Sequence, residues 1–345
     1  MIVESKLIFI ISLIIVIIIG VLGNLLNLFV FSHKSLKYIA TFRFLFYLSM
    51  IDLFVLTFCA SDTLLTYGYQ ILIRIHSTMA CRIHTFLTYF LTHLSSTILM
   101  IVSIERAFVI CRSRSILSRT ANSGKLKRYY VEIFILAVCV FLILINGHYL
   151  FFMDIVESGE SFDINIPITL YLNNKTVIDL DQILSKNENQ TQNHKIVYSC
   201  SPPQNFKNYY QFIFGVWIWI DVSLYSLLPF IIMTICSIII LKEINSKSKG
   251  FLRQTSRHNK IVTEKARRRN KKLLLMLVLT NTYFILCSLP LCIDILLSKF
   301  NIILISSIHF QVFFQIVAYS NNSVNFIFYF LFSNKYRDVV LGKNV

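Results

Sequence analysis

Long apolar runs separated by short polar segments dominate this chain. Seven of the runs are long enough to cross a membrane, since a spanning helix needs about 20 mostly apolar residues. We expect helices over about residues 7–31, 43–67, 81–110, 129–153, 209–241, 272–297 and 302–332. The pattern therefore predicts an all-α membrane protein, a seven-transmembrane-helix bundle that forms one domain over residues 1–345.

Composition agrees with a bilayer environment and limits what the charge can mean. Hydrophobic residues make up 56% of the 345 residues and charged residues 14%, well away from ordinary soluble composition. The net charge of +16 would suit a nucleic-acid partner, but the basic residues cluster in loops between apolar runs. We therefore expect membrane lipids as partners, and no nucleic acid.

The loops predict how the chain is oriented. Basic residues fill the segment "KSKGFLRQTSRHNKIVTEKARRRNKK" between the fifth and sixth runs, and acidic residues dominate the long segment between the fourth and fifth. Because cytoplasmic loops carry the excess of Lys and Arg, we expect a plasma-membrane protein with its N-terminus outside and its C-terminus in the cytoplasm. Two glycosylation sequons, at Asn174 and Asn189, fall in the acidic segment on the outer side.

Several polar side chains lie within the apolar runs. Polar groups in a bilayer are costly, and they usually face the interior of the bundle or a water-filled cavity. A carboxylate among hydroxyls and amides can stay ionised by holding a small cation. The alternative interpretation is that the amides only join helices, through hydrogen bonds worth about 1 kcal/mol each. The residues concerned are Asn24, Asp52, Ser95, Asn321 and Asn325.

Landmark residues occur in an order and at a spacing that resemble those of the rhodopsin-like (class A) G protein-coupled receptors. The landmarks are Asn24, Asp52, Arg106 in "ERA", Pro229, Pro290 and the pair Asn325 and Tyr329. Cys81 precedes Arg106 by the family's interval, and Tyr336-Arg337 follows where the family begins a short amphipathic helix. The resemblance covers nearly the whole chain and implies such a helix over about residues 334–342.

The resemblance implies a receptor rather than an enzyme. Such a protein transmits the binding of an extracellular ligand to a heterotrimeric G protein, and it takes no cofactor beyond an allosteric sodium ion. A disulfide between Cys81 and Cys200 is also implied. The implied sodium pocket is formed by Asp52, Ser95, Asn321 and Asn325. The implied switch residues are Glu105, Arg106, Asn325 and Tyr329 at the coupling end, with Asn24, Pro229, Phe284 and Pro290 along the helices.

Several positions depart from the family pattern and indicate a divergent member. Ala107 replaces the Tyr that follows Arg106, and Asn270 stands where an acid would hold Arg106 from the sixth run. Without that acid we expect a weakly held inactive state and basal activity. Phe326 replaces a proline, which leaves the backbone bonds of the last run intact and makes it straighter. A Trp and a Tyr of the family are replaced by Ser288 and Ser237.

Two absences narrow the ligand class. Thr88 stands where amine receptors hold an aspartate, and Tyr319 stands where opsins hold the retinal-linking lysine. Biogenic amines and light are therefore disfavoured. Thr88 and Tyr319, together with Gln315, are instead candidates for lining a pocket.

Two acids in the fifth and sixth runs suggest a cationic ligand. Asp221 and Asp294 are expected to point into an outer cavity, where an unpaired carboxylate accepts a cationic group. The hypothesis is a cationic neuropeptide; an amidated Arg-Phe ending, resembling the ligands of FMRFamide-type receptors, is one example. The alternative is that one acid pairs with His93 or His148 and serves packing only.

Three rival functions are compared with the coupled receptor. A seven-helix binding protein or chemosensor that does not couple stays open, because the family's Trp, Tyr and Pro are lost. A multi-pass transporter would need a charged or unwound pathway, whereas the polar residues here gather around one pocket. An intramembrane hydrolase would recruit His93, His148 and Asp221, whose spacing matches no metal or triad pattern.

Overall fold

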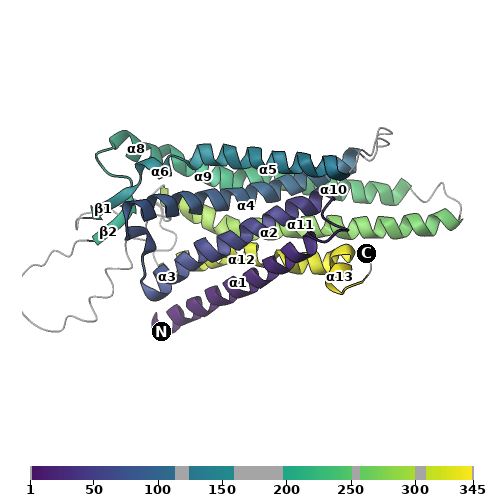
Figure 1. Cartoon of the computed structure of the whole chain (residues 1–345), viewed down its shortest axis with the longest axis horizontal. Coiled ribbons are helices and arrows are strands. Elements are labelled where there is room, and N and C mark those ends of the chain that lie inside the picture. Colours follow the sequence, from purple (N-terminus) through teal and green to yellow (C-terminus); the bar gives the residue numbers. More distant parts are fainter. Residues whose placement is uncertain (1, 113–123, 159–196, 251–256, 300–307, 344–345) are drawn as a thin grey trace, which may run out of the picture.

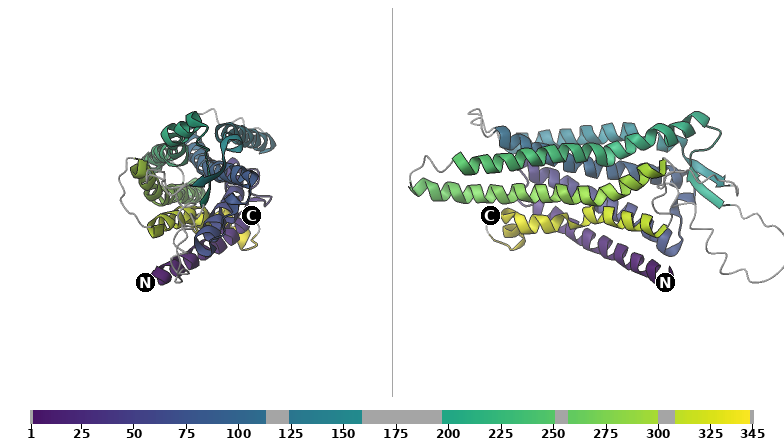
Figure 2. Two further views of the ribbon diagram at one scale, coloured as in Figure 1. Left: turned by 90° about the vertical axis from the view of Figure 1, so that its left-hand side faces the viewer. Right: turned by 180° about the vertical axis from the view of Figure 1, so that it is seen from behind.

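Long helices lying side by side form an elongated bundle (Figure 1). The computed structural model describes residues 2–112, 124–158, 197–250, 257–299 and 308–343. A two-stranded β-hairpin caps one end of the bundle, and the short helix α13 lies at the other. We call these the hairpin end and the α13 end. The N-terminus of α1 lies at the hairpin end, while the chain ends beside α13 (Figures 1 and 2).

Helices cover the described part of every predicted run. Runs one, three, six and seven are each a single helix: α1 (Ile2–Phe31), α4 (Thr78–Arg112), α11 (Arg257–Lys299) and α12 (Ile308–Phe332). Run four is α5 (Gly124–Asn146) followed, after a turn, by α6 (Tyr149–Phe152). The amphipathic helix is α13 (Asn334–Val340), which Ser333 caps by accepting a hydrogen bond from the Tyr336 backbone N–H.

Runs two and five contain wide π-type turns. Run two is α2 (Ala40–Phe54), η1 (Val55–Ala60) and α3 (Ser61–Tyr69). Run five is α8 (Lys207–Phe212), η4 (Ile213–Trp217), α9 (Ile218–Val222), η5 (Ser223–Leu227) and α10 (Leu228–Gly250). Pro229 explains η5, because proline has no N–H to donate and its ring crowds the carbonyl four residues earlier. No proline accompanies η1 or η4.

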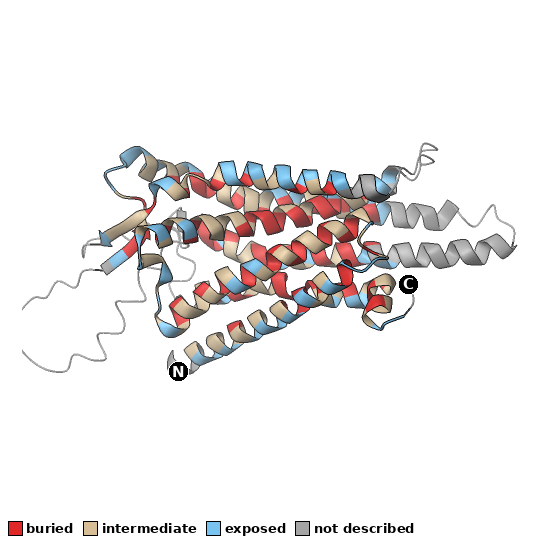
Figure 3. Cartoon of the chain, viewed as in Figure 1, coloured by how far each residue is buried: buried red, intermediate tan, exposed pale blue. Residues whose placement is uncertain are grey.

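Six helical segments of the described chain are long and apolar enough to cross a membrane. They are Lys6–Phe31, Ala40–Tyr69, Thr78–Val109, Tyr129–Phe152, Lys207–Lys242 and Leu274–Leu297. Helix α12 carries no charged residue and packs against α1 and α11, but its asparagines lower its mean hydropathy. The outer faces of α1 and α5 expose large apolar side chains such as Phe29 and Leu144 (Figure 3). Lipid is the environment that covers such faces.

The hairpin is tied to the end of α4. Strands β1 (Asp154–Ser158) and β2 (Val197–Ser201) pair antiparallel, with Ile155 opposite Cys200. A disulfide joins Cys200 to Cys81 in α4, and the Arg82 Nε donates to the Met153 carbonyl at 2.8 Å. The Thr78 hydroxyl donates to the Asp154 carboxylate at 2.7 Å and lowers the pKa of that group. Both predicted glycosylation sites, Asn174 and Asn189, lie outside the described residues.

Helices α1 and α12 approach each other closely at two glycines. A Cβ on Gly23 would overlap the ring of Phe326, and one on Gly20 would overlap Leu56 and Ser323. Small residues of this kind let helix backbones come together in a bilayer. The ring of Phe326, which replaces the proline of the rhodopsin-like pattern, thus occupies the space that Gly23 leaves, and α12 runs uninterrupted.

We predict that Gly23→Ala destabilises the protein. The added methyl group must displace the Phe326 ring, and overpacking of this kind costs about 1–3 kcal/mol. Gly215→Ala is the matched control, because a Cβ there meets nothing within 4 Å. Thermal unfolding of the purified protein should show a lower midpoint for Gly23→Ala and no decrease for Gly215→Ala. Equal midpoints for the two variants would contradict the close packing.

Candidate functional site

A carboxylate buried between three helices is the centre of the polar residues in the bundle. Asp52 of α2 is 1% exposed and accepts the Ser95 hydroxyl of α4 at 2.7 Å. From α12 it accepts the amide nitrogens of Asn322 at 2.7 Å and Asn325 at 2.9 Å. Asn322 also donates to the Ser95 oxygen at 3.1 Å. Three donors therefore satisfy this carboxylate without a basic side chain.

Asn322 is a member of this cluster that the sequence did not single out. Asn321, which was expected there, has no hydrogen bond to Asp52 in the described structure. Instead it lines a small cavity of about 20 Å³ together with Ser95 and Asn322. Asn321 and Asn322 lie four and three residues before Asn325. On a helix both spacings place a side chain near that of Asn325, so the spacing did not show which of the two contacts Asp52.

Helix α1 joins the cluster through α12. The amide nitrogen of Asn24 donates to the Asn322 carbonyl at 2.8 Å and to the Gly20 carbonyl at 2.9 Å. One residue further along α12, the Ser323 hydroxyl donates to the Val16 carbonyl at 2.9 Å. The close approach at the glycines therefore brings side chains of each helix to the backbone of the other.

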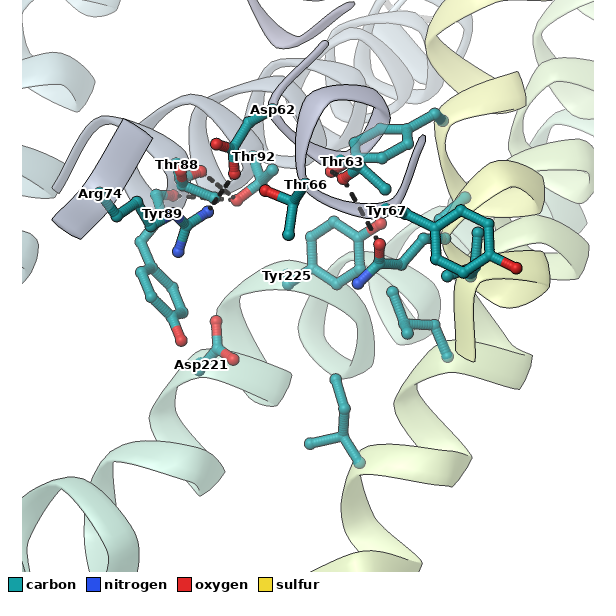
Figure 4. A pocket seen from close by; sticks show the side chains of 16 residues that line it. Asp62, Thr63, Thr66, Tyr67, Arg74, Thr88, Tyr89, Thr92, Asp221 and Tyr225 are labelled. Atoms are coloured by element: carbon teal, nitrogen blue, oxygen red, sulfur yellow. Dashed lines mark hydrogen bonds and ion pairs between the residues drawn. The ribbon is translucent and has the colours of Figure 1, made fainter. Parts of the chain in front are cut away.

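A second cavity, of about 140 Å³, lies toward the hairpin end (Figure 4). Four of the five predicted pocket residues line it. Asp294 is buried but is not among the described residues that line this cavity, so its role as a pocket residue stays a prediction. The lining residues are Asp62, Thr63, Thr66, Tyr67, Arg74, Thr88, Tyr89, Thr92, Asp221, Tyr225, Leu291, Ile295, Val312, Gln315, Ala318 and Tyr319.

Asp221 is paired, and not free as the main hypothesis assumed. Its Oδ1 lies 2.9 Å from Nε2 of His93, which is fully buried on α4. The contact is the one expected under the alternative hypothesis, in which Asp221 pairs with His93. Asp221 nevertheless lines the cavity, with 16% of its side chain exposed. The carboxylate thus serves packing against α4 and also faces the cavity.

An ion-pair cluster that sequence analysis missed forms another wall of the cavity. Asp62 of α3 lies 3.0 Å from the Arg74 Nη2 and 3.3 Å from the His84 Nε2. Arg74 belongs to the short 3-10 helix η2 (Ile73–Ile75), and His84 stacks on Phe58 at 4.5 Å. The missed signal was an acid within run two and a basic residue in the following short loop.

At the opposite end of α4, Glu105 and Arg106 are neighbours in an ion pair. The Arg106 Nε lies 3.2 Å from the Glu105 Oε2, which also accepts the Thr41 hydroxyl of α2 at 2.7 Å. Only 15% of the Arg106 side chain is exposed. The only described side chain within ion-pair distance of this guanidinium is therefore its neighbour on the same helix.

A neutral bridge links three helices one turn from Arg106. Asn281 of α11 is 1% exposed, and its Oδ1 accepts the Ser103 hydroxyl of α4 at 2.9 Å. Its amide nitrogen donates to the Ser237 hydroxyl of α10 at 3.1 Å. Both functional groups of the amide are used, each by a different helix. Ser237 is the residue that stands in place of a tyrosine of the rhodopsin-like pattern.

Tyr329 packs in an aromatic cluster and does not bond to Asn325 in the described structure. Its ring lies 5.5 Å from Phe31 and 6.0 Å from Tyr336, and its hydroxyl is buried without a hydrogen-bond partner among the described residues. Tyr336 of α13 donates its hydroxyl to the Asn27 Oδ1 of α1 at 2.7 Å. Helix α13 is thereby anchored to the first helix.

Of the remaining predicted switch residues, Phe284 contacts the fifth run, and the two prolines lie within helices. Phe284 is 2% exposed and meets the Tyr225 ring at 6.4 Å. Ser288 stands where the rhodopsin-like pattern has a tryptophan, and it accepts a long 3.5 Å hydrogen bond from Ser226. Pro290 lies inside α11, and Pro229 is the second residue of α10.

A comparison with protein families identifies a family of seven-transmembrane proteins, which agrees with the helical bundle. The model of one family, described as serpentine type 7TM GPCR chemoreceptor Srw, matches residues 10–342. The match spans the chain from the first turns of α1 to beyond α13. No curated protein matches the chain. The similarity to FMRFamide-type receptors stays a prediction.

We predict that Asn322→Ala destabilises the protein more than Asn321→Ala. The two neighbours are 8% and 7% exposed, but only Asn322 donates to the Asp52 carboxylate. Removing a buried hydrogen bond to a charged group costs about 1.5–3 kcal/mol. Thermal unfolding of the purified variants measures the difference. A lower midpoint for Asn321→Ala than for Asn322→Ala would contradict this assignment.

Proposed function

The chain belongs to the Srw family of serpentine seven-transmembrane G protein-coupled chemoreceptors, and on this premise we propose that it passes ligand binding to a heterotrimeric G protein. It is a multi-pass protein of the plasma membrane, and its family is one of receptors. The observation that carries the proposal concerns α4. This single helix lines the charged cavity at the hairpin end and holds the Glu105–Arg106 pair at its other end.

The proposed topology has seven spans, with the hairpin end outside and the α13 end in the cytoplasm. Six apolar segments and the packing of α12 between α1 and α11 support seven. Termini at opposite ends of the bundle also require an odd number of crossings. The basic segment between α10 and α11 supports the cytoplasmic assignment, and it offers a surface for anionic lipid and for the G protein.

The proposed ligand is peptide-like and carries a cationic group. Asp221 supports a cation, because its carboxylate faces the cavity while only one oxygen is taken by His93. The lining carries two carboxylates, those of Asp62 and Asp221, and one guanidinium, that of Arg74. A cationic group would therefore balance the charge of the cavity.

An allosteric sodium ion is the proposed cofactor, and the oxygens near Asp52 fit one. Asn321 Oδ1 and Asn325 Oδ1 are buried without a hydrogen-bond partner among the described residues. Asn321 also shares the small cavity with Ser95, a partner of Asp52. A hard cation prefers such carboxylate, hydroxyl and amide oxygens. When bound, sodium would supply the positive charge that the Asp52 cluster lacks.

Coupling is proposed to begin when α11 moves away from α4 and α10. The sequence of α11 contains no acid between Glu264 and Asp294, so the ionic contact of Arg106 is with Glu105. Asn281 then makes the polar contacts that hold α11 to its neighbours near Arg106. Two packings of these helices, biased by the ligand, are the general basis of such a switch.

A receptor that binds without coupling is the second candidate. Phe326 favours it, because this residue packs into the space at Gly23 and leaves α12 without the proline of the rhodopsin-like pattern. If rearrangement of the last helix is needed for coupling, an uninterrupted α12 opposes it. The exchange experiment below separates the two candidates.

We predict basal nucleotide exchange that depends on Arg106. Membranes carrying the chain should promote exchange on at least one of a panel of purified Gα proteins above empty membranes. Arg106→Ala should remove that activity, whereas Arg82→Ala, at the hairpin end, should keep it. An absence of exchange at confirmed surface expression would favour the receptor that does not couple.

We also predict that Asn281→Ala raises basal exchange. The change removes two hydrogen bonds that join α11 to α4 and α10, each worth about 1 kcal/mol, or about fivefold in an equilibrium constant. Thr280→Ala is the control, since Thr280 is equally buried but its one hydroxyl bond among the described residues is to the Met276 carbonyl of its own helix. Equal exchange by the two variants would contradict the proposed bridge.

A further inference from the structure

The charges of the cavity near the hairpin end are separated between two walls. Arg74 and Asp62 lie on one side, and Asp221 comes from the other (Figure 4). No contact between Arg74 and Asp221 is present in the described structure. The cavity thus has an Asp62–Arg74 ion pair on one wall and the Asp221 carboxylate on the other, facing a common space.

Arg74 retains donors that face this space. One terminal nitrogen contacts Asp62 at 3.0 Å, and Figure 4 shows the other pointing away from Asp62, toward the side of Tyr89 and Asp221. Asp62 also meets the His84 Nε2 at 3.3 Å, so its charge is shared between two partners. A guanidinium has several N–H donors in a fixed fork and is suited to binding a second carboxylate.

Asp221 also has atoms that can bind a ligand group. Its Oδ1 meets His93 at 2.9 Å, which leaves lone pairs on both oxygens of a carboxylate with 16% exposure. The Arg74 guanidinium can bind a negative group, and the Asp221 carboxylate can bind a positive one. A ligand that carries both a carboxylate and a cation satisfies both, whereas a simple cation leaves the Arg74 donors unpaired.

Size limits how much of the ligand enters. A cavity of about 140 Å³ is close to one that encloses a benzene molecule. Apolar side chains complete the lining, namely Leu291, Ile295, Val312 and Ala318. A group about the size of one amino-acid residue therefore fills the cavity, and any remaining part of the ligand lies outside it.

We propose that the group entering this cavity carries both a free carboxylate, bound by Arg74, and a cationic nitrogen, bound by Asp221. This deepens the proposed function, on whose ligand cavity it rests. Two sources share this chemistry: a free α-amino acid, and the C-terminal Arg or Lys of a peptide with an unmodified carboxylate. An amidated ending lacks the carboxylate and is expected to bind worse.

The test uses binding, so it does not depend on coupling. The probes are Nα-acetyl-L-arginine and its carboxamide, which differ only in the carboxylate, and L-leucine represents the free amino acids. Each is titrated against the purified full chain at concentrations up to the order of 10 mM while the unfolding midpoint is followed. We expect acetyl-arginine or leucine to stabilise the chain, and acetyl-arginine to act at about tenfold lower concentration than its amide.

Variants assign the two walls. Arg74→Gln should abolish the difference between acid and amide, and Asp221→Asn should weaken both. Arg82→Gln is the matched control, because Arg82 lies at the same end and bonds to the Met153 carbonyl outside the cavity lining. It should leave the preference unchanged. If Arg74→Gln folds poorly, Arg74→Lys, which keeps the charge but not the fork, should reduce the preference for the acid.

The outcomes are distinct from those of the exchange experiment. Stabilisation by leucine alone would support the shared chemistry with a free amino acid as its source, and stabilisation by acetyl-arginine alone would support a peptide C-terminus. Stabilisation of the unmodified chain by acid and amide at equal concentrations would overturn the proposal, as would no stabilisation by any probe. Either result leaves coupling through Arg106 untouched, since that depends on exchange.

Discussion

The arrangement of the bundle depends on a buried carboxylate that no basic side chain of the described residues contacts. Asp52 is held by a hydroxyl from α4 and two amides from α12, so one acidic group fixes the relative position of three helices. In hydrocarbon, the alternative to these bonds is a desolvated charge, which costs far more than a lost contact between apolar side chains. A change in the Asp52 environment is therefore also a change in how α12 sits against α2 and α4.

Several other charged residues within the described helices are also paired, whereas the buried Asp294 has an Oδ2 without a hydrogen-bond partner among the described residues. Asp62 is met by Arg74 and His84, Asp221 by His93, and Arg106 by Glu105. The first two groups lie around the cavity at the hairpin end and the third lies toward the α13 end. Because a bilayer tolerates charge only where it is paired or faces a cavity, these positions mark two polar regions, one at each end of the bundle.

Helix α4 connects these ends and packs against α2, α5, α10 and α11. It contributes Thr88 and His93 near the cavity, Ser95 beside Asp52, and Ser103 and Arg106 near the other end. The polar bonds along it are short and specific, and few of them are ionic. Coupling by rearranged hydrogen bonds between packed helices is consistent with small helix shifts that alternate between two packings.

Sequence alone determined the helical segments and the polar residues that had to face inward. Transfer into hydrocarbon is costly for each polar side chain separately, so the runs, and Asp52 within its run, can be read from composition along the chain. Tertiary structure decided which polar groups meet. Each residue turns the helix by about 100°, so Asn321 and Asn322 face differently, and the π turns around Asp62 and Asp221 rotate all that follows. Pairs such as Asp62 with Arg74, Asp221 with His93, and Asn281 with Ser103 and Ser237 depend on these rotations, to which hydropathy is insensitive.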